Sequence, residues 1–181
     1  AIKNSWRFGS GMAKIGLKGK QWLKGFHILF ICAWVGTGIS MLLIGFVKAR
    51  VPNGDELYAF NVAIKLLDEF IIIPAAFGSL ITGILLCWLT NWGFFKFNWI
   101  IFKWISTIAQ ILFGTFFLGP WTNGATAIAG AERVLALQNT TYLYFKQMNN
   151  CFGAVQMILL IAVIFISVLK PWGKRDKQSG A

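Results

Sequence analysis

The chain has 181 residues, of which 57% are hydrophobic and only 13% are charged, and its formal net charge is +11. The mean hydropathy is +0.66. A soluble domain of this size cannot hide so much apolar surface, whereas a lipid bilayer accepts it, so the composition excludes an ordinary soluble protein. The basic residues flank the apolar runs instead of forming one patch, so we expect contacts with anionic lipid headgroups and no nucleic acid.

Four apolar runs follow one another and predict four transmembrane helices, because a helix needs about 20 apolar residues to cross the hydrocarbon core. The clearest run, Phe70 to Leu89, is uncharged throughout. We expect an all-α integral membrane four-helix bundle, and the runs place its spans at about 22–47, 60–90, 97–121 and 145–169. The transmembrane domain then covers 22–169, between a basic segment at 1–21 and a basic tail at 170–181.

Residues 1–11 have two interpretations, since they end in Gly-Ser-Gly directly before Met12. They are either an added leader before a natural start at Met12 or part of a native basic tail. No function is inferred from this segment.

Basic residues predict the orientation of the bundle. All of the 17 Lys and Arg residues lie on the side of the two termini except Lys48, Arg50, Lys65, Arg133 and Lys146. The positive-inside rule therefore predicts that both termini are cytoplasmic. We expect the protein in a bacterial cytoplasmic membrane.

The segment between the third and fourth spans is long, from about Pro120 to Tyr144, and it contains the stretch ATAIAGAERVLALQ. This stretch has good helix propensity and a partial apolar stripe. We expect either a helix lying on the outer surface or an extension of the third span beyond the bilayer.

Polar side chains form stripes along the spans. The third span carries Lys103 and Gln110, and the fourth carries Asn149 and Gln156. Counting along the helices places Gln110 and Gln156 nearest the membrane centre. Such residues either join the helices through hydrogen bonds or line a narrow polar pathway, which four thin helices would form only in an oligomer.

A second polar group is expected at the outer end of the second span. Asp68 and Glu69 begin this region, Lys65 lies three and four residues before them, and Arg50 or Arg133 could also neutralise them. The group is either an interfacial network of ion pairs or a small outer binding site, because carboxylates within a membrane are functional candidates.

His27 is the only histidine, and it lies in the apolar first span. Imidazole is a common axial ligand of haem. Ligation by two histidines of one chain is excluded because there is no second histidine. The alternatives are a hydrogen-bonded structural histidine, a five-coordinate haem, a haem shared with another subunit, and a proton-handling role.

The spans resemble those of small bacterial membrane proteins. The first, WLKGFHILFICAWVGTGISMLL, resembles helices with an L-K-x-hydrophobic-H…W-x-G pattern. The second, LLDEFIIIPAAFGSLITGILL, resembles the D…P…T-G pattern of a family of uncharacterised predicted integral membrane proteins, whose third span ends in a turn similar to Leu118-Gly119-Pro120-Trp121 here. This resemblance implies a four-span fold and no particular activity.

The first span is also distantly similar to the copper-resistance D proteins and to the membrane protoporphyrinogen oxidase family. The second similarity implies haem on His27. No phosphate-binding loop, HExxH motif or nucleophile elbow is present in the sequence. The sequence therefore favours a non-enzymatic accessory subunit or small-ligand binding module, which assembles with other membrane helices as a homo- or hetero-oligomer. The alternatives are a haem-binding or redox protein that uses His27 and an oligomeric small transporter or channel.

Overall fold

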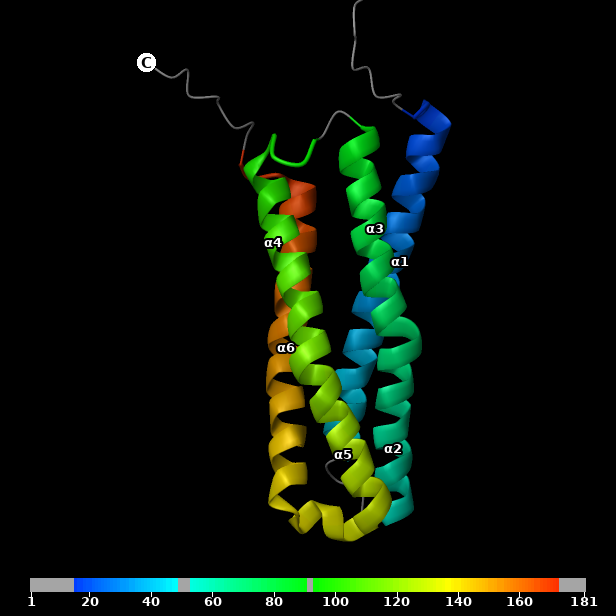
Figure 1. Cartoon of the computed structure of the whole chain (residues 1–181), viewed down its shortest axis with the longest axis vertical. Coiled ribbons are helices and arrows are strands. Elements are labelled where there is room, and N and C mark those ends of the chain that lie inside the picture. Colours follow the sequence, from blue (N-terminus) through cyan, green and yellow to red (C-terminus); the bar gives the residue numbers. More distant parts are fainter. Residues whose placement is uncertain (1–14, 49–52, 91–92, 173–181) are drawn as a thin grey trace, which may run out of the picture.

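The computed structural model describes residues 15–48, 53–90 and 93–172, and Figure 1 shows a bundle of long helices. Residues 1–11, with their two interpretations, and most of the basic tail at 170–181 lie outside these ranges. The α-helices are α1 (Leu17–Val47), α2 (Gly54–Leu67), α3 (Ile73–Leu89), α4 (Asn98–Phe113), α5 (Gly119–Glu132) and α6 (Thr140–Leu169). Short turns join some of them end to end, namely η2 (Asp68–Ile72), η3 (Gly114–Leu118) and η4 (Arg133–Gln138).

These elements form four continuous helical spans: Leu17–Val47, Gly54–Leu89, Asn98–Gln138 and Thr140–Leu169. Each is long and apolar enough to cross a membrane, which confirms the expected all-α, four-span fold. Three spans begin before the expected residues, and the third continues well past residue 121. The stretch ATAIAGAERVLALQ is therefore an extension of the third span, as one of the two alternatives predicted.

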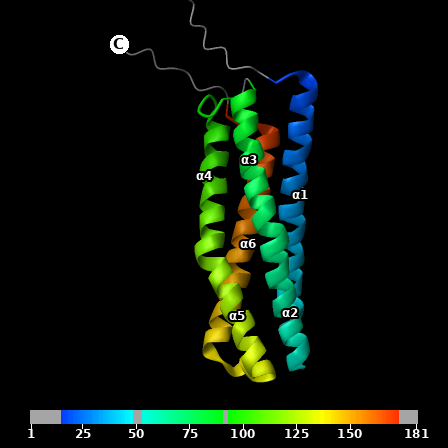
Figure 2. The same cartoon turned by 45° about the vertical axis from the view of Figure 1, so that its right-hand side comes forward.

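The four spans surround a common interior. Helix α1 packs against α3 and α6, and α5 packs against α2 and α6. The start of α1 and the end of α6 lie at one end of the bundle, called the terminal end here (Figure 1). The opposite end, called the distal end, holds the end of α1, the start of α2 and the connection from α5 to α6 (Figure 1). Figure 2 shows the same arrangement from another side, with α6 behind α3 and α5.

The second and third spans each contain a five-residue π-helical turn shortly before a proline. η2 ends directly before Ile73-Pro74, and η3 ends directly before Gly119-Pro120. Proline cannot donate a backbone hydrogen bond and its ring crowds the carbonyl four residues earlier. Before Pro74 the helix therefore forms a wider turn, in which the Ile73 N–H donates to the carbonyl of Asp68. Such π turns inside α-helices are frequent at functional sites.

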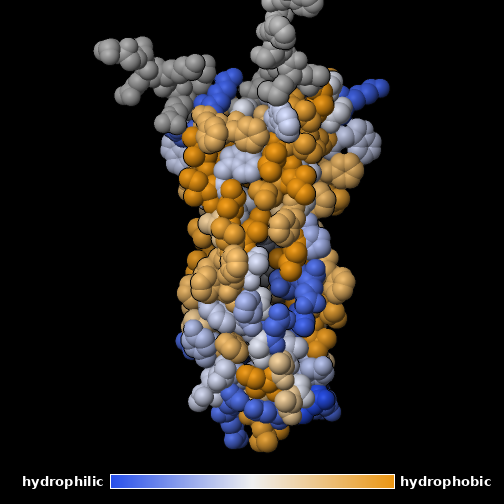
Figure 3. Space-filling model, viewed as in Figure 1, coloured by the Kyte–Doolittle hydropathy of each residue, from blue (hydrophilic) through white to orange (hydrophobic). Residues whose placement is uncertain are grey.

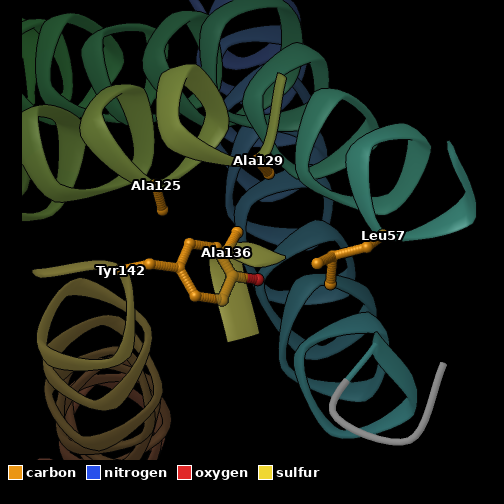
Figure 4. Packing of buried hydrophobic residues seen from close by; sticks show 5 residues of the cluster. All are labelled: Leu57, Ala125, Ala129, Ala136 and Tyr142. Atoms are coloured by element: carbon orange, nitrogen blue, oxygen red, sulfur yellow. The ribbon is translucent and has the colours of Figure 1, made fainter. Parts of the chain in front are cut away.

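Three groups of buried apolar residues hold the bundle together at different heights. At the distal end, Tyr142 packs among Leu57, Ala125, Ala129 and Ala136 (Figure 4), and its hydroxyl points toward the side where Leu57 lies. The middle group is formed by Trp34, Ala75, Ala76 and Leu160, and the group at the terminal end by Cys87, Trp99 and Ile100. Alanines at the contacts allow the helix backbones to approach closely.

The surface changes character along the bundle. On the face drawn in Figure 3, the upper part is largely hydrophobic, and hydrophilic residues gather in the lower part, toward the distal end. Many large apolar side chains are exposed along the spans, including Phe70, Ile81, Ile105, Ile158 and Phe165. Such a surface suits contact with lipid and is rare on a soluble monomer.

Candidate functional site: a polar cavity inside the bundle

A cavity of about 100 Å³ lies inside the bundle and is lined by residues of all four spans. Its wall contains apolar side chains such as Trp34 and Leu160. The polar side chains of the wall are Lys48, Asn61, Asp68, Gln110, Thr122, Asn149, Asn150 and Gln156. Polar groups within a membrane bundle are costly and usually serve a function. A cavity where several of them converge is therefore the candidate functional site.

Gln110 is the most unusual residue of this wall. It lies in α4 and is only 5% exposed. Its side-chain oxygen and nitrogen are both without a hydrogen-bond partner in the part of the chain that the structure describes. Its backbone carbonyl, in contrast, accepts a hydrogen bond of 3.2 Å from the Gln156 side chain of α6. The two glutamines thus meet in the cavity wall, but the Gln110 carboxamide keeps both of its bonding atoms unused.

Other polar residues of the wall link α5 to α6. The Thr122 hydroxyl lies 3.4 Å from Oδ1 of Asn149, a long hydrogen bond. Asn150 lies beside Gly45 of α1, where an added Cβ atom would come within 2.7 Å of its Oδ1 atom. The lack of a side chain at Gly45 therefore gives the Asn150 carboxamide its place next to the cavity.

Lys48 brings a positive charge to the cavity. It follows the last residue of α1 and is only 4% exposed, and its ammonium group donates a hydrogen bond of 2.9 Å to Oδ1 of Asn61. Burial, together with the neighbouring charge of Lys146, lowers the pKa of Lys48 to about 8. In the described chain no carboxylate lies within ion-pair distance of it. This amine is therefore a buried cation that depends on one amide oxygen.

Asn61 is held in place from two sides, which fixes the position of the Lys48 partner. Its Nδ2 atom donates to the backbone carbonyl of Leu57 at 2.8 Å and lies 3.2 Å from the hydroxyl of Tyr142. Tyr142 is fully buried in the distal apolar group. With its nitrogen engaged in this way, Asn61 presents its oxygen to Lys48.

Asp68 brings a negative charge to the same cavity. It is the first residue of η2, and its side chain is half-buried. Among the described residues, its carboxylate makes no hydrogen bond or ion pair. The cavity thus holds one cationic and one anionic side chain that do not pair with each other.

The structure does not gather the predicted outer group of Asp68, Glu69, Arg50 and Arg133 in one place. Arg50 lies outside the described residues. Glu69 pairs with Lys65 at 3.6 Å on the surface, as the spacing predicted. The Arg133 guanidinium lies 3.5 Å from the carboxylate of Asp55, and it stacks over the ring of Tyr58 at the distal end. Of the three that the structure describes, only Asp68 lines the cavity.

The structure brings together three of the four residues of the predicted stripe, which consists of Lys103, Gln110, Asn149 and Gln156. Gln110, Asn149 and Gln156 line the cavity, whereas Lys103 does not. The residues that sequence reasoning missed are Lys48, Asn61, Thr122 and Asn150. A signal for Asn61 was available, because it precedes Asp68 by seven residues and so shares its helix face.

His27 lies away from the cavity, toward the terminal end. Its Nδ1 atom is 2.8 Å from the hydroxyl oxygen of Thr82, and that hydroxyl donates at 2.6 Å to the carbonyl of Gly78. The histidine is thus hydrogen-bonded, as one alternative expected, and haem on His27 stays a prediction.

No group of three or more potential metal ligands occurs among the described residues. Comparisons with protein-family models, curated proteins and solved structures found no match to the chain. The functional argument therefore rests on the residues of the cavity, and the family resemblance of the spans stays a prediction.

Proposed function

We propose that this membrane protein binds a small polar solute in the cavity inside its bundle. The observation that carries the proposal is Gln110, a buried carboxamide that lines the cavity with both of its bonding atoms unpaired. An unsatisfied buried polar group costs about 1–3 kcal/mol. A solute with one donor and one acceptor toward Gln110 recovers that free energy, so binding and the stability of the bundle are coupled.

The proposal includes a location and a sidedness. Basic residues concentrate at the terminal end, which supports a cytoplasmic position for both termini in a bacterial cytoplasmic membrane. The cavity-lining Lys48, Asn61 and Asp68 lie toward the distal end, so the solute is taken from the side opposite the cytoplasm. The exposed apolar side chains of the spans contact lipid, and anionic headgroups contact the basic terminal end.

The test is the solute content of the purified full-length chain. The protein is isolated in mild detergent from its membrane, washed and denatured, and the extract is analysed by mass spectrometry. We expect a polar molecule near one equivalent in the wild type and a strong depletion in Gln110→Leu. Ile105→Leu is the matched control on the same helix, because Ile105 is 64% exposed on the outside of the bundle. Equal solute content in Gln110→Leu and wild type would refute the proposal.

The same purification separates the other functions predicted from the sequence. A purely structural accessory subunit would carry a partner chain and no solute. A haem protein would show a Soret band that His27→Ala removes. An oligomeric transporter would carry the solute and also form a stable oligomer in detergent.

A further inference from the structure

Two opposite charges line the cavity without forming an ion pair with each other. The Lys48 ammonium is 4% exposed and has the Asn61 oxygen as its partner. The Asp68 carboxylate has no partner among the described residues. Charges removed from water are costly unless they meet an opposite charge. Among the described residues, the burial of one positive and one negative charge is therefore not offset by an ion pair, and the Gln110 side chain is unpaired as well.

The separation of these charges follows from the helix that joins their positions. Asn61, which holds Lys48, and Asp68 are seven residues apart on one face of a continuous helical span. With a rise of about 1.5 Å per residue, their side chains lie about 10 Å apart along the axis. Asn and Asp side chains have the same length and lean the same way, so their ends keep this spacing.

The neighbours of each charge strengthen the difference between the two ends. Lys146 lies close enough to Lys48 to contribute to its lowered pKa. Glu69 follows Asp68 directly in the sequence. The side of the cavity near Lys48 is thus positive and the side near Asp68 is negative, with the Gln110, Asn149 and Gln156 carboxamides also on the wall.

We propose that the solute is a small zwitterion, with its carboxylate bound by Lys48 and its ammonium group bound by Asp68. This inference rests on the proposed function and names its ligand class. The Lys48 ammonium lies 2.9 Å from the Asn61 oxygen, so along the axis it is about 8 to 13 Å from the Asp68 carboxylate. A hydrogen bond of about 2.8 Å at each end leaves about 2 to 8 Å between the charges of the ligand. Standard bond lengths place extended 4-aminobutanoate near the middle of this range and an α-amino acid at its short end, so an amino acid with its charges several bonds apart fits better.

The experiment is a binding series with the full chain in detergent micelles, measured by isothermal titration calorimetry. The probes are glycine, 4-aminobutanoate and 6-aminohexanoate, and the controls with one charge are butylamine and butanoate. We expect the best ω-amino acid to bind at least tenfold more tightly than either control and than glycine. The inference is overturned if no zwitterion of the series binds better than the controls, which includes the outcome that the cavity holds water only.

Matched variants locate the binding. Lys48→Met and Asp68→Asn should each weaken zwitterion binding at least tenfold. Their controls are Lys65→Met and Glu56→Gln, which remove charges of the same kind at positions outside the cavity wall. Unchanged binding in either cavity variant would also overturn the inference. Thermal unfolding of every variant shows that it is folded before binding is compared.

The experiments distinguish a wrong ligand class from a wrong proposed function. If the extract of the wild type contains an uncharged polar solute that Gln110→Leu loses, the proposed function stands and the zwitterion is wrong. If the extract contains no polar solute and no probe binds, both are wrong.

Discussion

The bundle contains two polar regions, and they differ in how completely their hydrogen bonds are made. Toward the terminal end, His27 and Thr82 bond to each other, and Thr82 also bonds to the backbone of its own helix. Around the cavity, the Gln110 carboxamide has no partner among the described residues, and Lys48 has an amide oxygen as its partner. Satisfied polar pairs join helices, whereas unsatisfied ones beside a cavity mark a place for a ligand.

The apolar group of Trp34, Ala75, Ala76 and Leu160 lies between these two regions. Trp34 follows His27 by seven residues, and it also lines the cavity. It therefore closes the cavity on the side of His27. This apolar layer keeps the two polar regions apart. Its removal should therefore have the largest effect on the difference between them.

Trp34→Ala should have the largest effect. Trp34 is 6% exposed, and deleting a buried aromatic side chain costs about 3–5 kcal/mol. We expect a large drop in the thermal unfolding midpoint in detergent and weaker solute binding, because the enlarged cavity holds the solute loosely. Ile158→Ala is the control, since Ile158 is 67% exposed and its side chain faces outward. Similar losses in the two variants would show that Trp34 does not separate the regions.

The next effect is the pH dependence of stability that Lys48 gives to the cavity region. The pKa of Lys48 is lowered to about 8 in the folded chain from an ordinary value of 10.5. Between these two values the unfolded chain binds more protons than the folded one, so this residue makes stability rise with pH from about 8 to 10.5. Below pH 8 its contribution is constant, because the amine is then charged in both states.

The measurement is the thermal unfolding midpoint of wild type minus that of Lys48→Met, followed from pH 7 to 10.5. The difference should increase above pH 8 in favour of the wild type, by up to about 3 kcal/mol when converted to free energy. Taking the difference cancels the other titrating groups and the detergent. A flat difference would mean that Lys48 is not buried as a cation in the folded protein.

The distal end can be perturbed without touching the cavity wall. An added Cβ atom at Gly54 would lie 2.5 Å from the backbone nitrogen of Val134 and 2.7 Å from the Cβ atom of Arg133. Backbone at this distance must shift, so Gly54→Ala should destabilise the protein by about 1–3 kcal/mol. The unfolding midpoint reports the loss, and Gly16→Ala is the control because open space surrounds Gly16. Equal midpoints would show that α2 and η4 do not contact as described.

The fold was predictable from the sequence where composition alone decides it. The ends of the first, second and fourth spans were expected within a residue of their observed positions, since the apolar runs stop there. The start of the second span was not, because the polar residues around Asp55 look like a loop. In the structure Asn53 caps this helix by accepting a hydrogen bond from the backbone N–H of Asp55, and α2 packs on α5.

The candidate site was predictable only in part, for a related reason. The depth of Gln110 and Gln156 follows from counting along a helix, so their meeting could be expected. The partner of Arg133 could not, because it depends on how far the third span extends. That extension carries Arg133 to Asp55 and leaves Asp68 to the cavity. The expected first span ends at residue 47 and leaves Lys48 outside it, since a sequence does not show that a charge at a helix end folds inward.

The smallest effects give the sharpest contrast, because they should have opposite signs. Gln110→Leu replaces an unpaired carboxamide by an apolar side chain of similar size, and without solute it should stabilise the protein by about 1 kcal/mol. Thr82→Val removes the hydroxyl that pairs with His27 and should destabilise it by about the same amount. Both residues are buried in the bundle. Unfolding midpoints of the two variants, measured in one detergent after removal of the solute, test the contrast. If both variants lose stability, the Gln110 side chain has a partner in the folded protein, and the cavity region does not differ from the His27 region in the way that the proposed function requires.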